Sequence, residues 1–157
     1  MDAVARDQNS AYAERRIDID PTKYRNMRIA ALDMLRDETK YQDELLELYR
    51  QAIAATSDPQ AKCNHYSRRM ALYYTRHQYQ DAIREGTTAL RLGRKSETKA
   101  GLYLTIADSY LALGDRSNAN KMATDLLRNT VNPQMQDMAK QILQGKRVST
   151  IGTNSQV

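Results

Sequence analysis

The chain has no phenylalanine and no tryptophan, so its aromatic side chains are all tyrosine, ten of them in 157 residues. Tyrosine joins an apolar ring to a polar hydroxyl, which suits half-buried helix faces. We therefore expect a thin, elongated core rather than one deep globule. Cys63 is the only cysteine, which excludes an intramolecular disulfide and leaves the redox compartment open.

Long hydrophobic runs are missing as well. No stretch approaches the roughly 20 consecutive apolar residues of a membrane-spanning helix. The N-terminal residues MDAVARDQNSAYAERR lack the apolar run of a signal peptide. With Met1 as the native start, the sequence predicts a cytoplasmic protein without a membrane span.

Patterns that support catalysis or metal binding are also lacking. The chain has no glycine-rich phosphate loop, no nucleophile elbow and no paired-carboxylate site. Its two histidines, His65 and His77, have no cysteine or carboxylate beside them at the spacing of metal ligands. The sequence therefore predicts a protein that is not an enzyme and that uses no cofactor and no metal ion.

What the chain does contain is a regular series of helix starts. Each of its three prolines follows a residue that caps helices well, at Asp20-Pro21, Asp58-Pro59 and Asn132-Pro133. Ser96-Glu97 provides a fourth start. Successive starts lie 38, 38 and 36 residues apart, which indicates an internal repeat of about 37 residues.

Four columns of residues keep a spacing of 37: Leu45/Ala82/Ala119, Tyr49/Gly86/Ala123, Ala52/Ala89/Leu126 and Ile53/Leu90/Leu127. Apolar residues at helical spacing around them predict pairs of helices. The expected pairs are 21–38 with 41–56, 59–78 with 80–92, and two helices within 99–131 that are separated by Gly114. A last helix over 133–144 has no partner, so we expect it to cap the array.

The third unit reads Tyr103-x2-Ile106-Ala107-x2-Tyr110, then Gly114 and Ala119-x3-Ala123, and the second reads Tyr66-x2-Arg69-Met70-x2-Tyr73, then Tyr79-Gln80-Asp81-Ala82 and Ala89-Leu90. Over roughly residues 21–145 this pattern resembles the tetratricopeptide repeat (TPR) family. The period is longer than the family's usual value of about 34 residues. Gly86 and Ala123 also stand where a bulky residue is usual, and Met70 where a small one is.

The resemblance implies an all-α fold, a right-handed α-solenoid of about three helical hairpins with a C-terminal capping helix. It also implies protein or peptide binding on a concave face, without chemistry of its own. The expected organisation is a disordered or frayed segment over 1–19, a TPR-like repeat domain over 20–145 and a flexible tail over 146–157.

In that family the first helix of each pair lines the concave face. Carried over to this chain, the rule assigns partner binding to eight polar residues: Asn26, Asp33, Arg36, Asn64, Arg68, Tyr74, Thr105 and Asp108. Their mixture of amides, charges and one tyrosine suits a peptide groove. An ordinary solvated helix face would carry the same kinds of residue.

The net charge of +5 is concentrated in residues 61–95, which carry eight basic and two acidic side chains. Such a block attracts acidic proteins or nucleic acid. Its members lie on several helix faces, so nucleic acid is the least favoured partner. The sequence predicts a scaffold for a protein or peptide partner, acidic ones included. The alternative is a structural subunit or chaperone of a larger complex that uses its outer helices and the basic block. The oligomeric state is left open.

Overall fold

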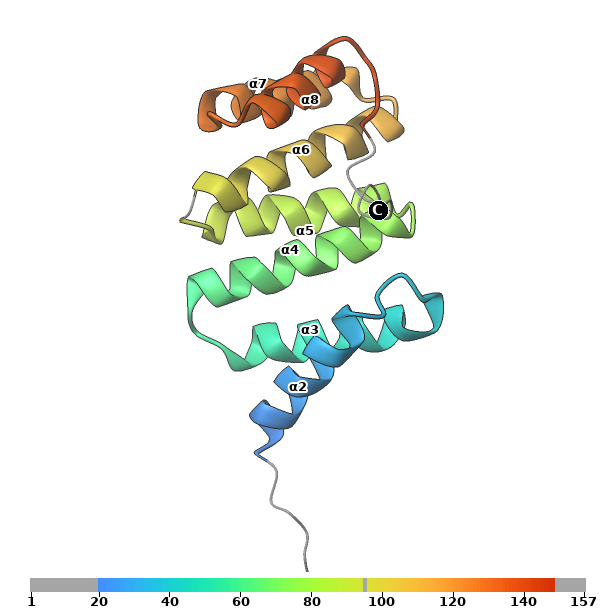
Figure 1. Cartoon of the computed structure of the whole chain (residues 1–157), viewed down its shortest axis with the longest axis vertical. Helices are drawn as coiled ribbons and strands as arrows, with labels where there is room; N and C mark the ends of the chain where they lie inside the picture. The colour runs from blue at the N-terminus through green and yellow to red at the C-terminus, as the bar shows by residue number, and fades with distance from the viewer. Residues whose placement is uncertain (1–19, 95, 149–157) are drawn as a thin grey trace, which may run out of the picture.

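The computed structural model describes residues 20–94 and 96–148, and within them all regular structure is helical, with seven helices and no strand. The all-α prediction is therefore confirmed for this part of the chain. The helices, shown in Figure 1, are α2 (Pro21–Asp33), α3 (Thr39–Ala55), α4 (Pro59–Thr75), α5 (Tyr79–Leu92), α6 (Ser96–Ala112), α7 (Arg116–Asn129) and α8 (Pro133–Leu143). None of these helices is both long and apolar enough to cross a membrane.

Side-chain caps set the predicted helix starts. The Asp58 carboxylate accepts hydrogen bonds from the backbone N–H groups of Gln60 and Ala61, and Pro59 occupies the first turn. Asp20 and Asn132 cap α2 and α8 in the same way. Each cap satisfies N–H groups that a helix N-terminus leaves unpaired. The starts at residues 21, 59, 96 and 133 are thus confirmed.

Two helix pairs are joined by the same type of turn. Gly114 has a φ of 79°, and the Asp115 N–H donates to the Tyr110 carbonyl. The turn that follows α4 repeats this pattern, with His77 at a φ of 58° and the Gln78 N–H bonded to the Tyr73 carbonyl. This is the Schellman arrangement, in which a left-handed residue ends the helix. His77 and Gly114 are 37 residues apart, so the repeat extends to the turns.

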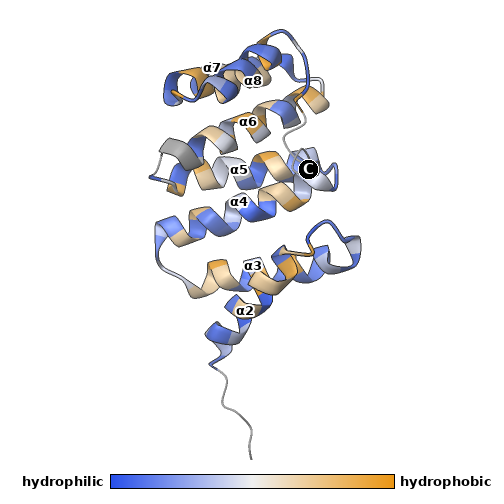
Figure 2. Ribbon diagram, viewed as in Figure 1, coloured by the Kyte–Doolittle hydropathy of each residue, from blue (hydrophilic) through white to orange (hydrophobic). Residues whose placement is uncertain are grey.

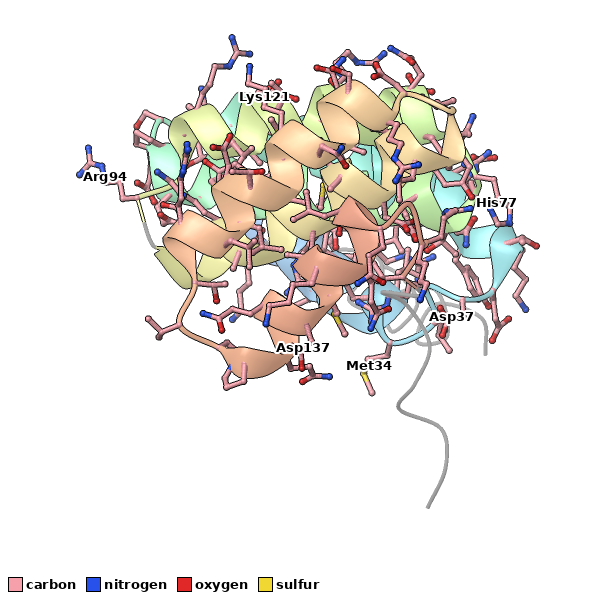
Figure 3. All side chains as sticks on the ribbon, turned by 90° about the horizontal axis from the view of Figure 1, so that it is seen from above. Met34, Asp37, His77, Arg94, Lys121 and Asp137 are labelled. Carbon is pink, nitrogen blue, oxygen red and sulfur yellow. The ribbon has the colours of Figure 1, made fainter. Side chains whose placement is uncertain are left out.

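Each helix packs against the next one along the chain, which gives the stack in Figure 1. In addition, α4 contacts α6 and α6 contacts α8, whereas α3, α5 and α7 do not contact one another in the described part of the chain. Figure 3 shows Lys121 of α7 along one edge of the stack and Asp137 of α8 along the opposite edge. The even-numbered helices from α4 to α8 therefore approach one another more closely than the odd-numbered ones.

The core is divided into three hydrophobic clusters along the stack. Each helix carries both hydrophobic and hydrophilic residues (Figure 2). The first column of the repeat, Leu45, Ala82 and Ala119, has no solvent exposure. Ala107 and Ala123, predicted to form the seam of the third pair, are equally buried in one cluster with Ala119.

The first helix pair and the C-terminal segment differ from the prediction. Helix α2 ends at Asp33 instead of residue 38, and α3 begins at Thr39. The side chain of Met34 is 87% exposed, so nothing apolar holds residues 34–38 in a helix. Residues 146–148, assigned to a flexible tail, include Val148 at only 5% exposure. The predictions for 1–19 and for 149–157 lie outside the described residues.

Candidate functional site

Asp108 of α6 is a carboxylate with no solvent exposure. Its Oδ2 accepts a hydrogen bond of 2.7 Å from the hydroxyl of Tyr74, which lies in the last turn of α4. An ionised carboxylate that is taken out of water needs several donors to compensate for its lost hydration. Further donors for Asp108 come from residues 146–148, which follow α8 and which we call the return segment.

Arg147 of the return segment supplies the opposite charge. Its Nη2 and Nε donate to Asp108 Oδ2 at 2.6 and 3.1 Å. The guanidinium carbon lies 5.0 Å from the centroid of the Tyr79 ring, and Nη1 is 3.3 Å from the Tyr79 hydroxyl. The hydrogen bonds to Asp108 raise the pKa of Arg147 above its ordinary value. Tyr79 and Asp108 therefore hold a permanent cation between them.

Val148 anchors the return segment through its backbone and its side chain. Its N–H donates to Asp108 Oδ1 at 2.7 Å, and its carbonyl oxygen lies 3.4 Å from the Tyr74 hydroxyl, whose proton is shared with Asp108. The side chain belongs to the hydrophobic cluster that includes Leu104, Ala107 and Ala139. The site thus holds the guanidinium of one residue, Arg147, together with the backbone N–H and the aliphatic side chain of the next residue, Val148.

A second polar cluster joins α2 and α3 to α4. Asp33 accepts from the Tyr49 hydroxyl at 2.6 Å and forms an ion pair with Arg68. Burial, followed by the Asp33 contact, raises the pKa of Tyr49. Burial and then the charges of Arg68 and Arg25 lower the pKa of His65, whose ring lies 5.9 Å from that of Tyr49. This cluster ties the first pair to the second and leaves Arg68 half exposed.

The structure separates the eight predicted site residues into two pairs, one residue beside a pair and three exposed residues. Asp33 and Arg68 are paired with each other, and so are Tyr74 and Asp108. Thr105 lies one turn before Asp108 and donates to the Gly101 carbonyl. The other three are exposed and lie outside both pairs: Asn26, Arg36 and Asn64.

Tyr74 and Asp108 differ from the expectation that they face an open groove, because the return segment covers them. Tyr74 is 8% exposed and Asp108 fully buried. Sequence reasoning missed Tyr79, Arg147 and Val148. An aspartate in the apolar α6, which must find a buried partner, was the one signal that a cation was needed. Nothing in the sequence indicated that residue 147 would supply it.

The described residues contain no group of three or more His, Cys, Asp or Glu side chains that could hold a metal ion. Cys63 is buried in the second hydrophobic cluster. In comparisons with known proteins, no family model, no curated protein and no solved structure matches the chain.

Proposed function

We propose that the protein is a non-catalytic binding module that holds an extended segment of a protein partner on the concave face of a TPR-like array. The observation that carries this proposal is the return segment itself. Its backbone and side chains are bound by residues of α4, α5 and α6, as a peptide ligand would be. A surface that already binds two consecutive residues of its own chain, Arg147 and Val148, has the chemistry to bind a foreign segment.

The packing of the helices supports a concave face on this side. Helices α4, α6 and α8 contact one another in series, while α3, α5 and α7 do not among the described residues. A stack of helices is concave on the side where the helices lie closer together, which here is the side of α4, α6 and α8. The α-solenoids of repeat proteins acquire their binding surfaces by such curvature.

Exposed polar residues continue this face beyond the return segment. Asn64 and Arg68 lie on α4 in solvent, and the side chain of Arg68 is 52% exposed. Both are accessible to a partner, but Arg68→Ala also removes the ion pair with Asp33, whose side chain is 18% exposed, so circular dichroism must verify the fold of that variant. They are therefore suitable probes, whereas truncation of Tyr74 or Asp108 would disturb the core.

The test is site-specific photo-crosslinking. A photoreactive amino acid is placed at Asn64 or Arg68 on the proposed face and, as a matched control, at Arg84 or Arg91 on α5. Proteins captured from cell extract are identified by mass spectrometry, and the crosslinked positions are mapped. We expect one partner to crosslink at Asn64 and Arg68 and to bind less well to Arg68→Ala. Crosslinks confined to Arg84 and Arg91 would contradict the proposal.

One observation favours the alternative of an assembly subunit. Large apolar side chains are exposed on α2 and in the turn after it, with Tyr24 at 56%, Met27 at 62% and Met34 at 87%. Figure 3 shows Met34 pointing away from the helices. A larger complex would cover such residues. In that case the crosslinks would lie on α2 and α5. A third outcome, binding that falls steeply with salt and is competed by RNA, would indicate a nucleic-acid partner instead.

A further inference from the structure

The return segment is held mainly by two of its residues, Arg147 and Val148. Gly145, with a φ of 77°, ends α8 and turns the chain back toward α4 and α6, as Figure 1 shows in red. Lys146 is exposed, and the side chain of Arg147 remains 45% exposed although its head group is bound. Only Val148 enters the core.

The receptor for this segment is built from other helices. Asp108 belongs to α6, Tyr74 to α4 and Tyr79 to α5, and we call these three residues the arginine site. The rings of Tyr74 and Tyr79 meet edge to face at 5.7 Å. None of the three lies in α8, so the return segment brings ligand groups and no receptor groups.

We infer that the arginine site binds a partner segment in which an arginine is followed by an aliphatic residue, and that the return segment is an intramolecular occupant which such a partner displaces. This inference rests on the proposed function, because it requires that the concave face binds peptides. It adds the chemistry of the ligand and a means of regulation.

The geometry selects for arginine over lysine. Two nitrogens of the Arg147 guanidinium reach Asp108 while a third approaches the Tyr79 hydroxyl, and the guanidinium carbon lies over the Tyr79 ring. A lysine ammonium is a single point charge and cannot make this set of contacts. Because Asp108 has no solvent exposure, a ligand that lacks the cation leaves the carboxylate poorly compensated.

The next residue is selected by its backbone and by its size. The Val148 N–H donates to Asp108 Oδ1, so the residue after arginine cannot be proline, which has no N–H group. Its side chain lies in an apolar cluster, which disfavours a charged residue there.

Because the return segment occupies the arginine site, a partner must bind more tightly to displace it. A segment tethered by a short linker competes at an effective concentration on the order of millimolar. A free peptide of the same sequence therefore binds the intact protein weakly, and release of the return segment should strengthen its binding.

The experiment uses a fluorescent peptide of sequence GKRVST, residues 145–150 of the chain, and measures its anisotropy on titration with the full-length protein. In the variant Arg147→Ala the return segment loses the cation that binds Asp108, so the segment, Val148 included, leaves the site more readily. We expect this variant to bind the peptide about tenfold more tightly than the wild type, because the tethered segment keeps its effective concentration but binds the site less tightly. Lys140→Ala, an exposed change on α8, is the matched control and should leave the affinity unchanged.

Peptide variants test the chemistry. Replacement of the peptide arginine by lysine should weaken binding to Arg147→Ala by about tenfold or more, as expected for lost hydrogen bonds to a buried charge. Replacement of its valine by aspartate should weaken binding by a similar factor, because it places a charge in an apolar cluster. Tyr79→Leu in the same background should weaken the arginine peptide more than the lysine peptide. Circular dichroism and denaturant unfolding verify that each variant is folded.

Equal affinity of wild type and Arg147→Ala, or no preference for arginine over lysine, would overturn the inference. Its failure is distinguishable from failure of the proposed function. A partner that still crosslinks at Asn64 and Arg68 would leave the concave-face function intact without an arginine site. A peptide that binds Arg147→Ala while the partner crosslinks only at Arg84 and Arg91 would preserve the arginine site and contradict the proposed function.

Discussion

Gly86 and Met70 explain two departures from the repeat pattern through a single contact. A Cβ atom on Gly86 would lie 2.6 Å from Met70 Sδ and 2.7 Å from Ile106 Cγ1. The glycine of α5 therefore makes room for the methionine of α4 and the isoleucine of α6. A small residue stands where a bulky one is usual, and its large neighbour occupies the space.

Gly86→Ala should lower the free energy of unfolding by about 1–3 kcal/mol, because the added methyl group overpacks a filled site. The double variant Gly86→Ala/Met70→Ala should lose less free energy of unfolding than the sum of the losses in the two single variants, because Met70→Ala removes one of the two clashes. Gly101→Ala is the control. A Cβ there meets nothing within 4 Å, so this change should instead stabilise α6 by up to about 1 kcal/mol. Urea unfolding measures the four variants and the wild type. Equal midpoints for Gly86→Ala and wild type would contradict the close packing.

Gly114 illustrates a constraint from backbone geometry alone. Its φ is 79°, and no atom lies within 4 Å of the position of a Cβ. Gly114→Ala should therefore cost about 1 kcal/mol through backbone strain, although it clashes with nothing. Gly101→Ala should change stability in the opposite direction, although an added Cβ meets nothing at either position, so the difference between the two variants isolates backbone strain. Thermal unfolding of the two variants provides the comparison. A stabilised Gly114→Ala would show that the turn can relax.

Glu85 of α5 gives a pH dependence whose sign can be derived. It is 4% exposed and pairs with Arg69, but burial outweighs the cations and raises its pKa. A carboxyl group whose pKa is raised on folding binds its proton more tightly in the folded state. Its contribution to stability therefore increases as the pH falls from neutrality through the folded pKa toward the ordinary value of about 4.3.

The comparison of wild type with Glu85→Gln isolates this effect, because all other titrating groups are common to both proteins. Relative to the variant, wild type should become more stable as the pH is lowered from 7 toward 4.5. Guanidinium unfolding at three pH values in this range provides the measurement. A relative loss of stability on acidification would show that the ion pair with Arg69 dominates over burial.

The helices themselves were largely predictable, because their signals are local. The caps Asp58-Pro59 and Asn132-Pro133 and the turn at Gly114 each depend on residues close in sequence, and the 37-residue columns repeat such local patterns. The end of α2 was not predictable in this way. Leu35 continues its apolar pattern, but in the fold it remains 40% exposed.

The candidate site was only partly predictable, for the same reason. The repeat pattern placed Asp33, Arg68, Tyr74 and Asp108 on first helices, and the structure pairs them across neighbouring units. The contact between Arg147 and Asp108 spans 39 residues and depends on the direction in which the chain leaves α8. No periodic signal carries that direction.

Packing that is confined largely to neighbouring helices determines how the whole molecule should open. Each of the three clusters draws on adjacent helices, and the one containing α2 ends in exposed apolar residues. In such an arrangement stability is approximately a sum of local units and their interfaces, so opening need not be global. We expect amides of α2 to exchange with solvent first and those of α6, which contacts α4, α5, α7 and α8, to exchange last.

Two core truncations at opposite ends test this gradient. Leu32 is 2% exposed in the cluster of α2 and α3, and Ile142 is fully buried in the cluster of α6, α7 and α8. Each change to alanine should cost about 2–4 kcal/mol locally. Leu32→Ala should accelerate hydrogen exchange in α2 and α3 while α7 and α8 keep their protection, and Ile142→Ala should do the reverse. Exchange that accelerates uniformly in either variant would mean that the helices unfold as one cooperative unit, because a local loss of packing would then lower the stability of every helix together.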